Sequence, residues 1–370
     1  MEGDHIKNQD WLLPLAWIYG LGVSVRNLLF DLGIKKSKSY NVPVINVGNL
    51  TVGGTGKTPH TEYIIRLLRN KYNVAVLSRG YKRKSKGFVL ANETSTMQDI
   101  GDEPYQMKQK FPDIRIAVDK KRCHGIEKLI ADNIQPPVEV IVLDDAYQHR
   151  YVTPGVNILL MDYHRLIYFD KLLPAGRLRE PKSGIKRADI VIVTKCPPYI
   201  TPMDKRGIER SLELDNWQTL FFSTFRYGNL YQLFDDDVQT NNTMSIEQLK
   251  EYKGKILLVS GIASPKQLEY DLSKFITFDT CSFSDHHLFT KKDIKMIESK
   301  YSGGIIITTE KDASRFKDIG KNAFSEQVSR NIYVLPVEVD FMSDTAEQFN
   351  SIISSYVQKN SRNSTLNKTK

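Results

Sequence analysis

The chain has 370 residues, of which 41% are hydrophobic, and this length is sufficient for two globular domains. Its three cysteines, Cys123, Cys196 and Cys281, are isolated, which argues against a disulfide framework or a cysteine-based zinc site and fits a reducing compartment. The formal net charge of +9 favours an anionic partner, which on charge alone is nucleic acid, a nucleotide or an anionic membrane surface.

The N-terminus is apolar. Residues 11–25 (WLLPLAWIYGLGVSV) contain no charged side chain, but this run is shorter than the roughly 20 residues that span a bilayer. No small-residue cleavage pattern follows it, which argues against a cleaved signal peptide. The sequence therefore predicts an apolar, membrane-associating helix within residues 1–34; the alternative is a helix buried against the main domain. Aromatic and basic residues suited to a membrane interface flank the run, namely Trp11, Trp17, Tyr19, Lys35, Lys36 and Lys38.

Residues 42–69 (VPVINVGNLTVGGTGKTPHTEYIIRLLR) predict a strand, a glycine-rich loop and a helix, in the order of a phosphate-binding P-loop. The backbone N–H groups of such a loop and the helix N-terminus favour an anion. Lys57 would contact the β- and γ-phosphates of a nucleotide, and the Thr58 hydroxyl would bind Mg²⁺. Thr51 stands where the usual pattern has its first glycine, so an ordinary strand–turn–helix is the alternative. The predicted nucleotide-binding set is Thr51, Val52, Gly53, Gly54, Thr55, Gly56, Lys57 and Thr58.

Two polar segments follow the next predicted strand, residues 74–77. Residues 78–84 (SRGYKRK) begin with Ser78 and Arg79 and carry four cations, so they form either an anion-contacting loop or a solvated basic face. Residues 101–104 (GDEP) open a predicted helix, where an acidic pair such as Asp102 and Glu103 is by itself typical of helix capping.

Residues 138–143 (VEVIVL) predict a buried parallel strand that ends in Asp144 and Asp145. An apolar strand ending in aspartate downstream of a P-loop is the Walker B pattern, whose carboxylate holds Mg²⁺. Adjacent residues at a strand end point in different directions, so one carboxylate would face the metal and the other the substrate or Lys57. Gln148 and His149 follow, where α/β sheets bind ligands.

Residues 173–181 (LPAGRLREP) carry two arginines, Arg177 and Arg179, that could bind an anion. Further predicted strands come before and after this segment, and a second α/β pattern begins near residue 255. The sequence thus predicts an α/β fold. Its parts are a P-loop NTPase core with a parallel sheet flanked by helices (35–220), an extended linker (221–242), a smaller C-terminal α/β domain (243–357) and a disordered tail (358–370).

The motifs occur in an order that resembles the tetraacyldisaccharide 4′-kinase family of the lipid A pathway. The resemblance covers most of the chain, from about residue 42 to residue 313, and the apolar N-terminus. Any one motif is modest evidence, whereas the ordered set is highly specific. The motifs are VGNLTVGGTGKTP (47–59), LSRGYKRKSKG (77–87), GDEP (101–104), LDDAYQHR (143–150), LLPAGRLREP (172–181), SGIASP (260–265), FSDHHLFT (283–290) and TTEKDA (308–313).

The resemblance implies a P-loop kinase that moves the γ-phosphate of ATP to the 4′-hydroxyl of a tetraacyldisaccharide 1-phosphate and makes lipid IVA. It implies ATP and Mg²⁺ as cofactors, no nucleic-acid partner, and a location at the cytoplasmic face of the bacterial inner membrane. It also implies two α/β domains joined by a short two-stranded linker, with the active site in the cleft between them.

The resemblance further implies residue roles. Asp102 would be the general base, assisted by His286, because a sugar hydroxyl is a poor nucleophile at neutral pH. Glu103 would lie near the metal, and Asp145 would be the Mg²⁺-associated Walker B acid. Arg79 and Arg177 are candidates to stabilise negative charge on the transferred phosphoryl group, and Asp144, Gln148 and His149 are candidates for substrate or phosphate contacts. The family's usual D-D-G-F-Q-H-R reads D-D-A-Y-Q-H-R here, and F-P-D-H reads F-S-D-H.

Two alternatives remain open from the residues. One is a P-loop GTPase or metal-insertion ATPase without a lipid acceptor, which the GGTGKT loop alone would allow. The other is a membrane-bound nucleotide sensor that binds ATP without transferring phosphate. The apolar N-terminus and residues 284–287 (SDHH) count against the first, and the presence of both Asp102 and His286 counts against the second.

Overall fold

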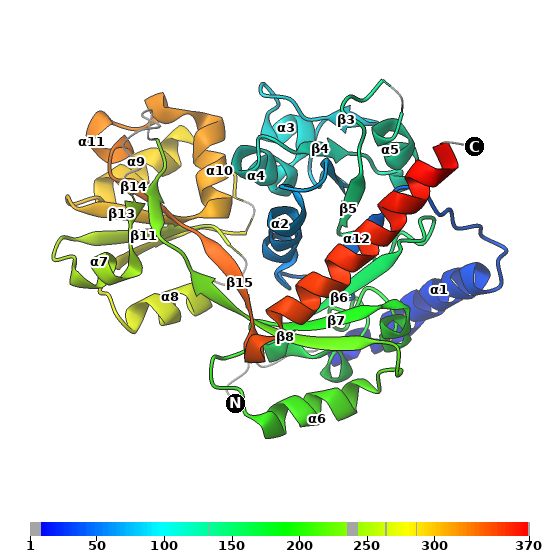
Figure 1. Ribbon diagram of the computed structural model, residues 1–370. Helices are drawn as coiled ribbons and strands as arrows, with labels where there is room; N and C mark the ends of the chain where they lie inside the picture. The colour runs from blue at the N-terminus through cyan, green and yellow to red at the C-terminus, as the bar shows by residue number, and fades with distance from the viewer. Residues whose placement is uncertain (1–8, 132, 235–242, 263–264, 286, 369–370) are drawn as a thin grey trace.

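The structure is a computed structural model that describes residues 9–131, 133–234, 243–262, 265–285 and 287–368, with side chains described up to residue 360. Two mostly parallel sheets, one of nine strands and one of six, lie side by side with helices around each (Figure 1). We call the nine-stranded sheet with its helices the first domain and the six-stranded sheet with its helices the second domain. The predicted α/β fold with a parallel P-loop core is confirmed.

The first-domain sheet consists of apolar, β-branched runs whose parallel central strands are buried on both faces, as strands covered by helices on both sides must be. Strand β1 lies at its centre, between β6 and β5. Outer strands β15 and β3 are antiparallel to their neighbours. In spatial order the strands are β15 (Val337–Phe341), β8 (Thr219–Tyr227), β7 (Ile190–Thr194), β6 (Val156–Asp162), β1 (Val44–Asn49), β5 (Val140–Asp144), β2 (Val74–Ser78), β4 (Arg115–Val118) and β3 (Val89–Leu90).

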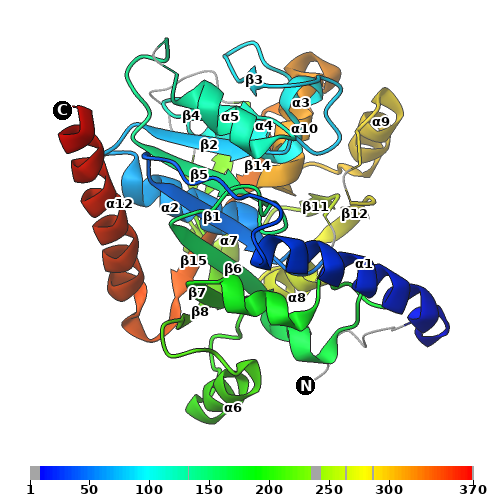
Figure 2. The same cartoon turned by 90° about the vertical axis from the view of Figure 1, so that its right-hand side faces the viewer.

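Helices cover both faces of this sheet. Helices α2 and α12 share one apolar core with the sheet, and α5 and α6 contribute to separate cores with other sheet residues. In Figure 2 the long helices α12 and α1 lie on opposite sides of the strands. The helices are α1 (Leu13–Asp31), α2 (Lys57–Leu68), α3 (Met97–Ile100), α4 (Asp102–Lys110), α5 (Arg122–Leu129), α6 (Pro202–Leu212) and α12 (Ala346–Lys368).

The second domain repeats the parallel arrangement on a smaller scale. Strands β12, β11, β13 and β14 are parallel, and β9 and β10 continue the sheet in antiparallel fashion. The strands in spatial order are β10 (Thr243–Met244), β9 (Leu230–Gln232), β14 (Ile332–Leu335), β13 (Ile305–Thr309), β11 (Ile256–Ser260) and β12 (Asp279–Ser282). The helices are α7 (Ile246–Glu251), α8 (Pro265–Ser273), α9 (Lys291–Lys300), α10 (Glu310–Ile319) and α11 (Glu326–Ser329).

Two antiparallel connections join the domains. The chain leaves the first sheet through β8, enters the second as β9, and returns through β14 into β15, which pairs with β8. Residues 337–357 were expected in the C-terminal domain, but β15 and the start of α12 pack on the first sheet instead, because Phe341, Phe349 and Ile353 join its core. Helix α12 continues to Lys368, into the segment 358–370 for which the sequence predicts disorder. Residues 235–242 of the expected linker lie outside the described residues.

The domains also meet directly, through α4 of the first and α10 of the second. Arg315 of α10 pairs with Asp102 at the start of α4, and Glu310 of α10 pairs with Lys110 at the end of α4. The two helices are therefore antiparallel neighbours with an ion pair toward each end. This contact places the start of α4, where the predicted general base lies, at the boundary between the domains.

Candidate active site

The P-loop joins the carboxyl end of β1 to the N-terminus of α2, as the sequence predicts. Gly56 has φ +83°, a left-handed conformation, and a Cβ at this position would lie 2.6 Å from Phe225. Only glycine meets both conditions, because an L side chain is strained there and a methyl group would clash. Helix α2 begins at Lys57, so the free N–H groups of its first turn and its partial positive charge lie in the loop.

Side chains from neighbouring strands hold the loop in place. Asn49 donates to Thr55 Oγ1 at 2.8 Å, and Thr194 of β7 donates to the Thr55 carbonyl at 3.0 Å. His60 Nδ1 lies 2.7 Å from the Gly56 carbonyl and its Nε2 lies 3.0 Å from Ser223 Oγ of β8. Burial lowers the pKa of His60 to about 4, although the Gly56 hydrogen bond raises it, so the ring is neutral and donates from one nitrogen only.

Asp145 lies beside the P-loop lysine. It follows β5 with φ +49°, and its Oδ1 lies 3.8 Å from Lys57 Nζ. Arg179 Nη1 donates to both Asp145 oxygens, at 3.0 and 3.2 Å, and contacts Gln148 Oε1 at 3.3 Å. Burial alone would raise the pKa of Asp145, but Lys57 and Arg179 lower it overall, so the carboxylate is ionised.

Asp144 is fully buried next to it, with two acidic neighbours. Ser78 donates to Asp144 Oδ2 at 3.0 Å, while Oδ1 has no hydrogen-bond partner among the described residues. Burial, followed by the charges of Glu103 and Asp145, raises the pKa of Asp144 to about 7, although Lys57 lowers it. A buried carboxylate with an unsatisfied oxygen and two acidic neighbours is a favourable place for a cation.

A buried arginine holds the backbone at the end of β5, where Asp144 and Asp145 lie. Arg122 donates to the Asp119 carbonyl at 2.7 Å and to the Asp144 carbonyl at 3.3 Å, and burial lowers its pKa to about 10. Burial lowers the pKa of His149 to about 4, and the nearby cations Arg122, Arg26 and Arg79 lower it further. His149 is therefore neutral at physiological pH, and Arg79 itself is exposed.

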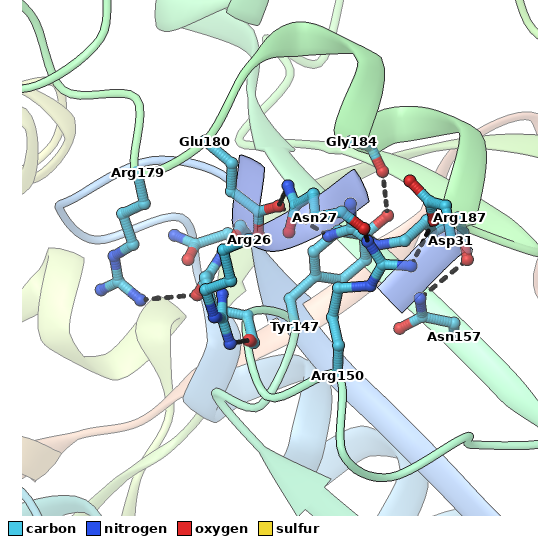
Figure 3. Close-up of polar contacts among 12 residues, drawn as sticks. Arg26, Asn27, Asp31, Tyr147, Arg150, Asn157, Arg179, Glu180, Gly184 and Arg187 are labelled. Carbon is cyan, nitrogen blue, oxygen red and sulfur yellow. Dashed lines mark hydrogen bonds and ion pairs between the residues drawn. The ribbon is translucent and has the colours of Figure 1, made fainter. Parts of the chain in front are cut away.

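Helix α1 contacts the two loops that carry Asp145 and Arg179 (Figure 3). Arg26 donates to the Gln148 carbonyl at 2.8 Å, and Tyr19 donates to the Arg179 carbonyl at 2.7 Å. Asn27 donates to the buried carboxylate of Glu180 at 3.1 Å, which Arg187 also contacts at 2.9 Å. One side of α1 thus packs against the active-site loops. For this side, the alternative of a helix buried against the main domain describes the structure.

The other side of α1 is apolar and exposed. Trp17 is 71% exposed, and by length and composition residues Asp10–Asp31 could cross a membrane, the one such stretch in the described part of the chain. The exposed apolar residues of the helix and its flanks are Trp11, Leu15, Trp17, Ile18, Leu21, Val25, Leu28, Leu32 and Ile34.

The predicted base Asp102 begins α4 and accepts a hydrogen bond from Arg315 Nη2 at 2.9 Å, across the domain boundary. His286, its predicted partner, lies outside the described residues. Neighbouring Asp285 pairs with Lys311 at 3.2 Å, so Asp285 itself lies beside α10.

The structure brings five of the predicted residues together around the ends of β1, β2 and β5, namely Lys57, Asp144, Asp145, Gln148 and Glu103. Thr58 lies in the first turn of α2, while Val52, Gly53 and Gly54 are exposed in the loop. Of the two arginines, Arg179 contacts Asp145, whereas Arg177 is exposed near Gly53. Sequence reasoning did not single out His60, Arg122 or Arg315, which lie outside recognised P-loop patterns.

A glycine loop with Lys-Thr at a helix N-terminus, beside a strand that ends in two aspartates, defines a P-loop nucleotide-binding protein. A sequence profile of the family described as tetraacyldisaccharide-1-P 4′-kinase matches residues 9–358, and the chain belongs to this family. The resemblance seen in the motifs is confirmed.

Curated relatives and a solved structure agree with this assignment. A protein of Phocaeicola vulgatus named tetraacyldisaccharide 4′-kinase is 56% identical over 98% of this chain and 99% of its own length. A Bacteroides fragilis protein of the same name is 51% identical over 99% and 98%. The crystal structure of LpxK from Aquifex aeolicus in complex with ATP has a TM-score of 0.73 and 30% identity, covering 94% of this chain and 99% of that one.

Proposed function

We propose that this chain is an ATP-dependent kinase that phosphorylates the 4′-hydroxyl of tetraacyldisaccharide 1-phosphate, giving lipid IVA. The observation that carries the proposal is the approach of Lys57 to Asp145 at the end of β5, beside the orphaned Asp144 carboxylate. This is the phosphate and metal end of a P-loop site, in a chain whose relatives are named for this reaction.

Mg²⁺ fits the residues that surround Asp144. We propose that Thr58 and Asp145 hold the ion, with Glu103 near it and Asp144 adding negative charge. No group of three or more His, Cys, Asp or Glu side chains in the described chain is arranged to hold a metal alone. That is typical of Mg²⁺ sites, where one or two side chains act together with substrate phosphates and waters. Once bound, the ion would neutralise negative charge on the phosphates.

The protein's own groups then have separate tasks. The P-loop backbone and Lys57 bind the β- and γ-phosphates, and Asp102 accepts the proton of the acceptor hydroxyl, with His286 as its assistant. Arg179 holds Asp145 in place, and we place Arg177 and Arg79 as cations near the phosphoryl group or the substrate. Gln148 and His149 complete the polar surface at the end of β5.

The two sides of α1 support the proposed location. Its exposed side is apolar and carries Trp17, with Trp11 just before the helix, which suits the interface of a bilayer, while its other side contacts the active-site loops. We propose that α1 holds the site against the cytoplasmic face of the inner membrane, where an acylated substrate with a polar head would be within reach. Lys35, Lys36 and Lys38 follow the helix and suit anionic headgroups.

The test is a transfer assay with purified protein, γ-labelled ATP, Mg²⁺ and the tetraacylated disaccharide 1-phosphate in detergent. The proposal predicts label on the lipid at the 4′ position, and none when the lipid is omitted. Release of inorganic phosphate at the same rate without lipid, or a preference for GTP, would support the GTPase or metal-insertion ATPase alternative. Tight ATP binding without any transfer would support the nucleotide sensor.

A further inference from the structure

Two motifs of the second domain have no task in the site described above. They are SGIASP (260–265) and TTEKDA (308–313), which lie where β11 and β13 end. Asp312 of the second motif is fully buried. Its Oδ2 accepts hydrogen bonds from Gly261 N at 2.9 Å and from Thr309 Oγ1 at 2.7 Å. The two motifs therefore build one fixed carboxylate inside the second domain.

That carboxylate holds a buried arginine. Arg315 is 2% exposed, and its Nη1 donates to Asp312 Oδ1 at 2.8 Å and to the Gly261 carbonyl at 3.1 Å. Asp312 already neutralises the guanidinium within the second domain. A planar guanidinium presents donors in several fixed directions, so one arginine can hold a second acceptor without giving up the first.

The second acceptor is Asp102 of the other domain. Arg315 Nη2 donates to Asp102 Oδ2 at 2.9 Å, while Asp102 keeps 16% of its side chain exposed. Buried ion pairs contribute little net stability, because desolvation offsets the attraction. A fixed donor does, however, restrict the orientation of a partly exposed carboxylate at the start of a helix.

We propose that Arg315 is a positioning residue that orients Asp102 for proton removal from the acceptor hydroxyl, so that contact between the domains completes the active site. This inference rests on the proposed function and on Asp102 as its base. The motifs of the second domain would then serve the reaction by fixing the guanidinium, without contacting the nucleotide.

The experiment is a double-mutant cycle on the full-length protein. Arg315→Met, Asp102→Asn and the double variant are compared with the unaltered protein for single-turnover transfer, and ATP affinity is measured in parallel. Arg315→Lys tests rescue, because an ammonium keeps the charge but lacks the fork that reaches two carboxylates. Asp318→Ala is the matched control, since Asp318 of α10 also contacts the first domain, by accepting from Met97 N at 3.3 Å.

We expect Arg315→Met to lower kcat by roughly ten- to a hundredfold, the scale of a misplaced catalytic group, with ATP affinity changed by less than about twofold. The kcat of Arg315→Lys should lie between the values for Arg315→Met and the unaltered protein. In the Asp102→Asn background the same substitution should cost little more, because residues that act as a unit are not additive. Asp318→Ala should leave kcat nearly unchanged.

Three results would overturn the inference: unaltered kcat in Arg315→Met, the same loss in both Asp102 backgrounds, or an equal loss in Asp318→Ala. Should Arg315→Met not fold, Arg315→Lys in both backgrounds decides by the same criteria. Impaired Asp102→Asn with fully active Arg315 variants removes the inference alone and leaves the kinase assignment intact. Fully active Asp102→Asn would instead show that the proposed base is wrong, and the inference would fall with it.

Discussion

Both domains place their polar groups at the carboxyl ends of parallel strands, but the two groups differ in charge balance. In the first domain Asp144 is buried with an orphaned oxygen, and burial together with Glu103 and Asp145 raises its pKa to about 7. In the second domain the buried carboxylate of Asp312 is fully hydrogen-bonded and is paired with Arg315. The first arrangement needs a cation to complete it, whereas the second is complete without a ligand.

The difference teaches how the two domains divide the work. In our proposal the first-domain site binds Mg²⁺ and the nucleotide, because a cation balances its buried carboxylates and phosphate is attracted to the helix N-terminus. The second-domain network positions Asp102, because a rigid set of fully hydrogen-bonded groups can hold the Arg315 donor in a fixed direction. Variants at the P-loop and at the end of β5 should therefore alter both nucleotide binding and turnover, and variants of Asp312 and Arg315 should alter turnover alone.

The largest effect is expected at Asp102, the point where the two domains meet. Asp102→Ala should lower kcat by roughly 10² to 10⁴, the range for loss of a general base, with ATP affinity nearly unchanged. His286→Ala should act similarly, and the double variant should be little worse than the worse single. Single-turnover transfer and nucleotide binding measure this. Asp113→Ala, at an exposed pair with Arg69, serves as control. If Asp102→Ala weakened ATP binding alone, Asp102 would be a residue of the metal site and not the base.

Lys57→Ala should lower kcat by at least roughly a hundredfold, as for loss of one preorganised donor, and should also weaken ATP binding. Lys71→Ala, an exposed lysine just beyond the other end of α2, should have no such effect. Steady-state kinetics and ATP titration of both variants decide the matter. Near-normal turnover of Lys57→Ala would mean that the loop is structural.

His60 should make the stability of the first domain depend on pH. Its pKa is lowered from 6.5 to about 4 in the folded protein, so between these values the unfolded chain binds more protons. The stabilising contribution is fully present above pH 6.5 and is lost as the pH falls toward 4, by about 3 kcal/mol at most. Denaturant midpoints across this window should fall less steeply in His60→Gln, and the exposed His164→Gln should follow the unaltered protein. Parallel curves for all three would contradict the assignment.

The two arginines of residues 172–181, Arg177 and Arg179, should differ in how much they contribute to kcat. Arg179→Gln removes the side chain that holds Asp145 and should lower kcat by about tenfold, as expected if Asp145 is the proposed metal-site carboxylate and loses its partner. Arg177→Gln should have a smaller effect, because this side chain is exposed and makes no comparable contact with Asp145 among the described residues. Kinetics at several Mg²⁺ concentrations test the ranking, and the reverse order would refute it.

The smallest effect should come from the outer side of α1. Trp17→Ser with Leu21→Ser removes exposed apolar area and should shift the protein from the membrane fraction toward the soluble fraction by a few fold. Tyr19→Phe is the control, since it loses only the hydrogen bond to the Arg179 carbonyl and should stay in the membrane fraction. Unchanged fractionation of the double variant would mean that this side does not bind the membrane.

Much of the fold and of the P-loop site was predictable from the sequence, because both depend on local sequence patterns. Apolar β-branched runs predicted the strands that surround the site, and the glycine loop before Lys57 predicted the start of α2. The order of the motifs predicted the family. These features depend on neighbouring residues, so a single chain is sufficient to read them.

The remaining features depend on long-range packing. The return of β15 and α12 to the first sheet follows from Phe341 and Phe349 finding space beside Phe221, more than a hundred residues earlier in the chain. Which arginine of residues 172–181 meets Asp145 depends on the conformation of that segment beside Leu50 and Val52. Arg315 carried no sequence signal, because its partner Asp102 lies in another domain.

The most direct test of the central claim, that the first domain binds the nucleotide and the second orients the base, is a crystal structure with Mg²⁺ and a non-hydrolysable ATP analogue. The account predicts the γ-phosphate against Lys57 and the P-loop backbone, and Mg²⁺ beside Asp145. The Asp102 carboxylate should lie within about 7 Å of the γ-phosphorus, so that one hydroxyl fits between them, and still accept from Arg315. A nucleotide bound away from Lys57, or an Asp102 turned away from the γ-phosphate and held by Arg315 in that position, would contradict it.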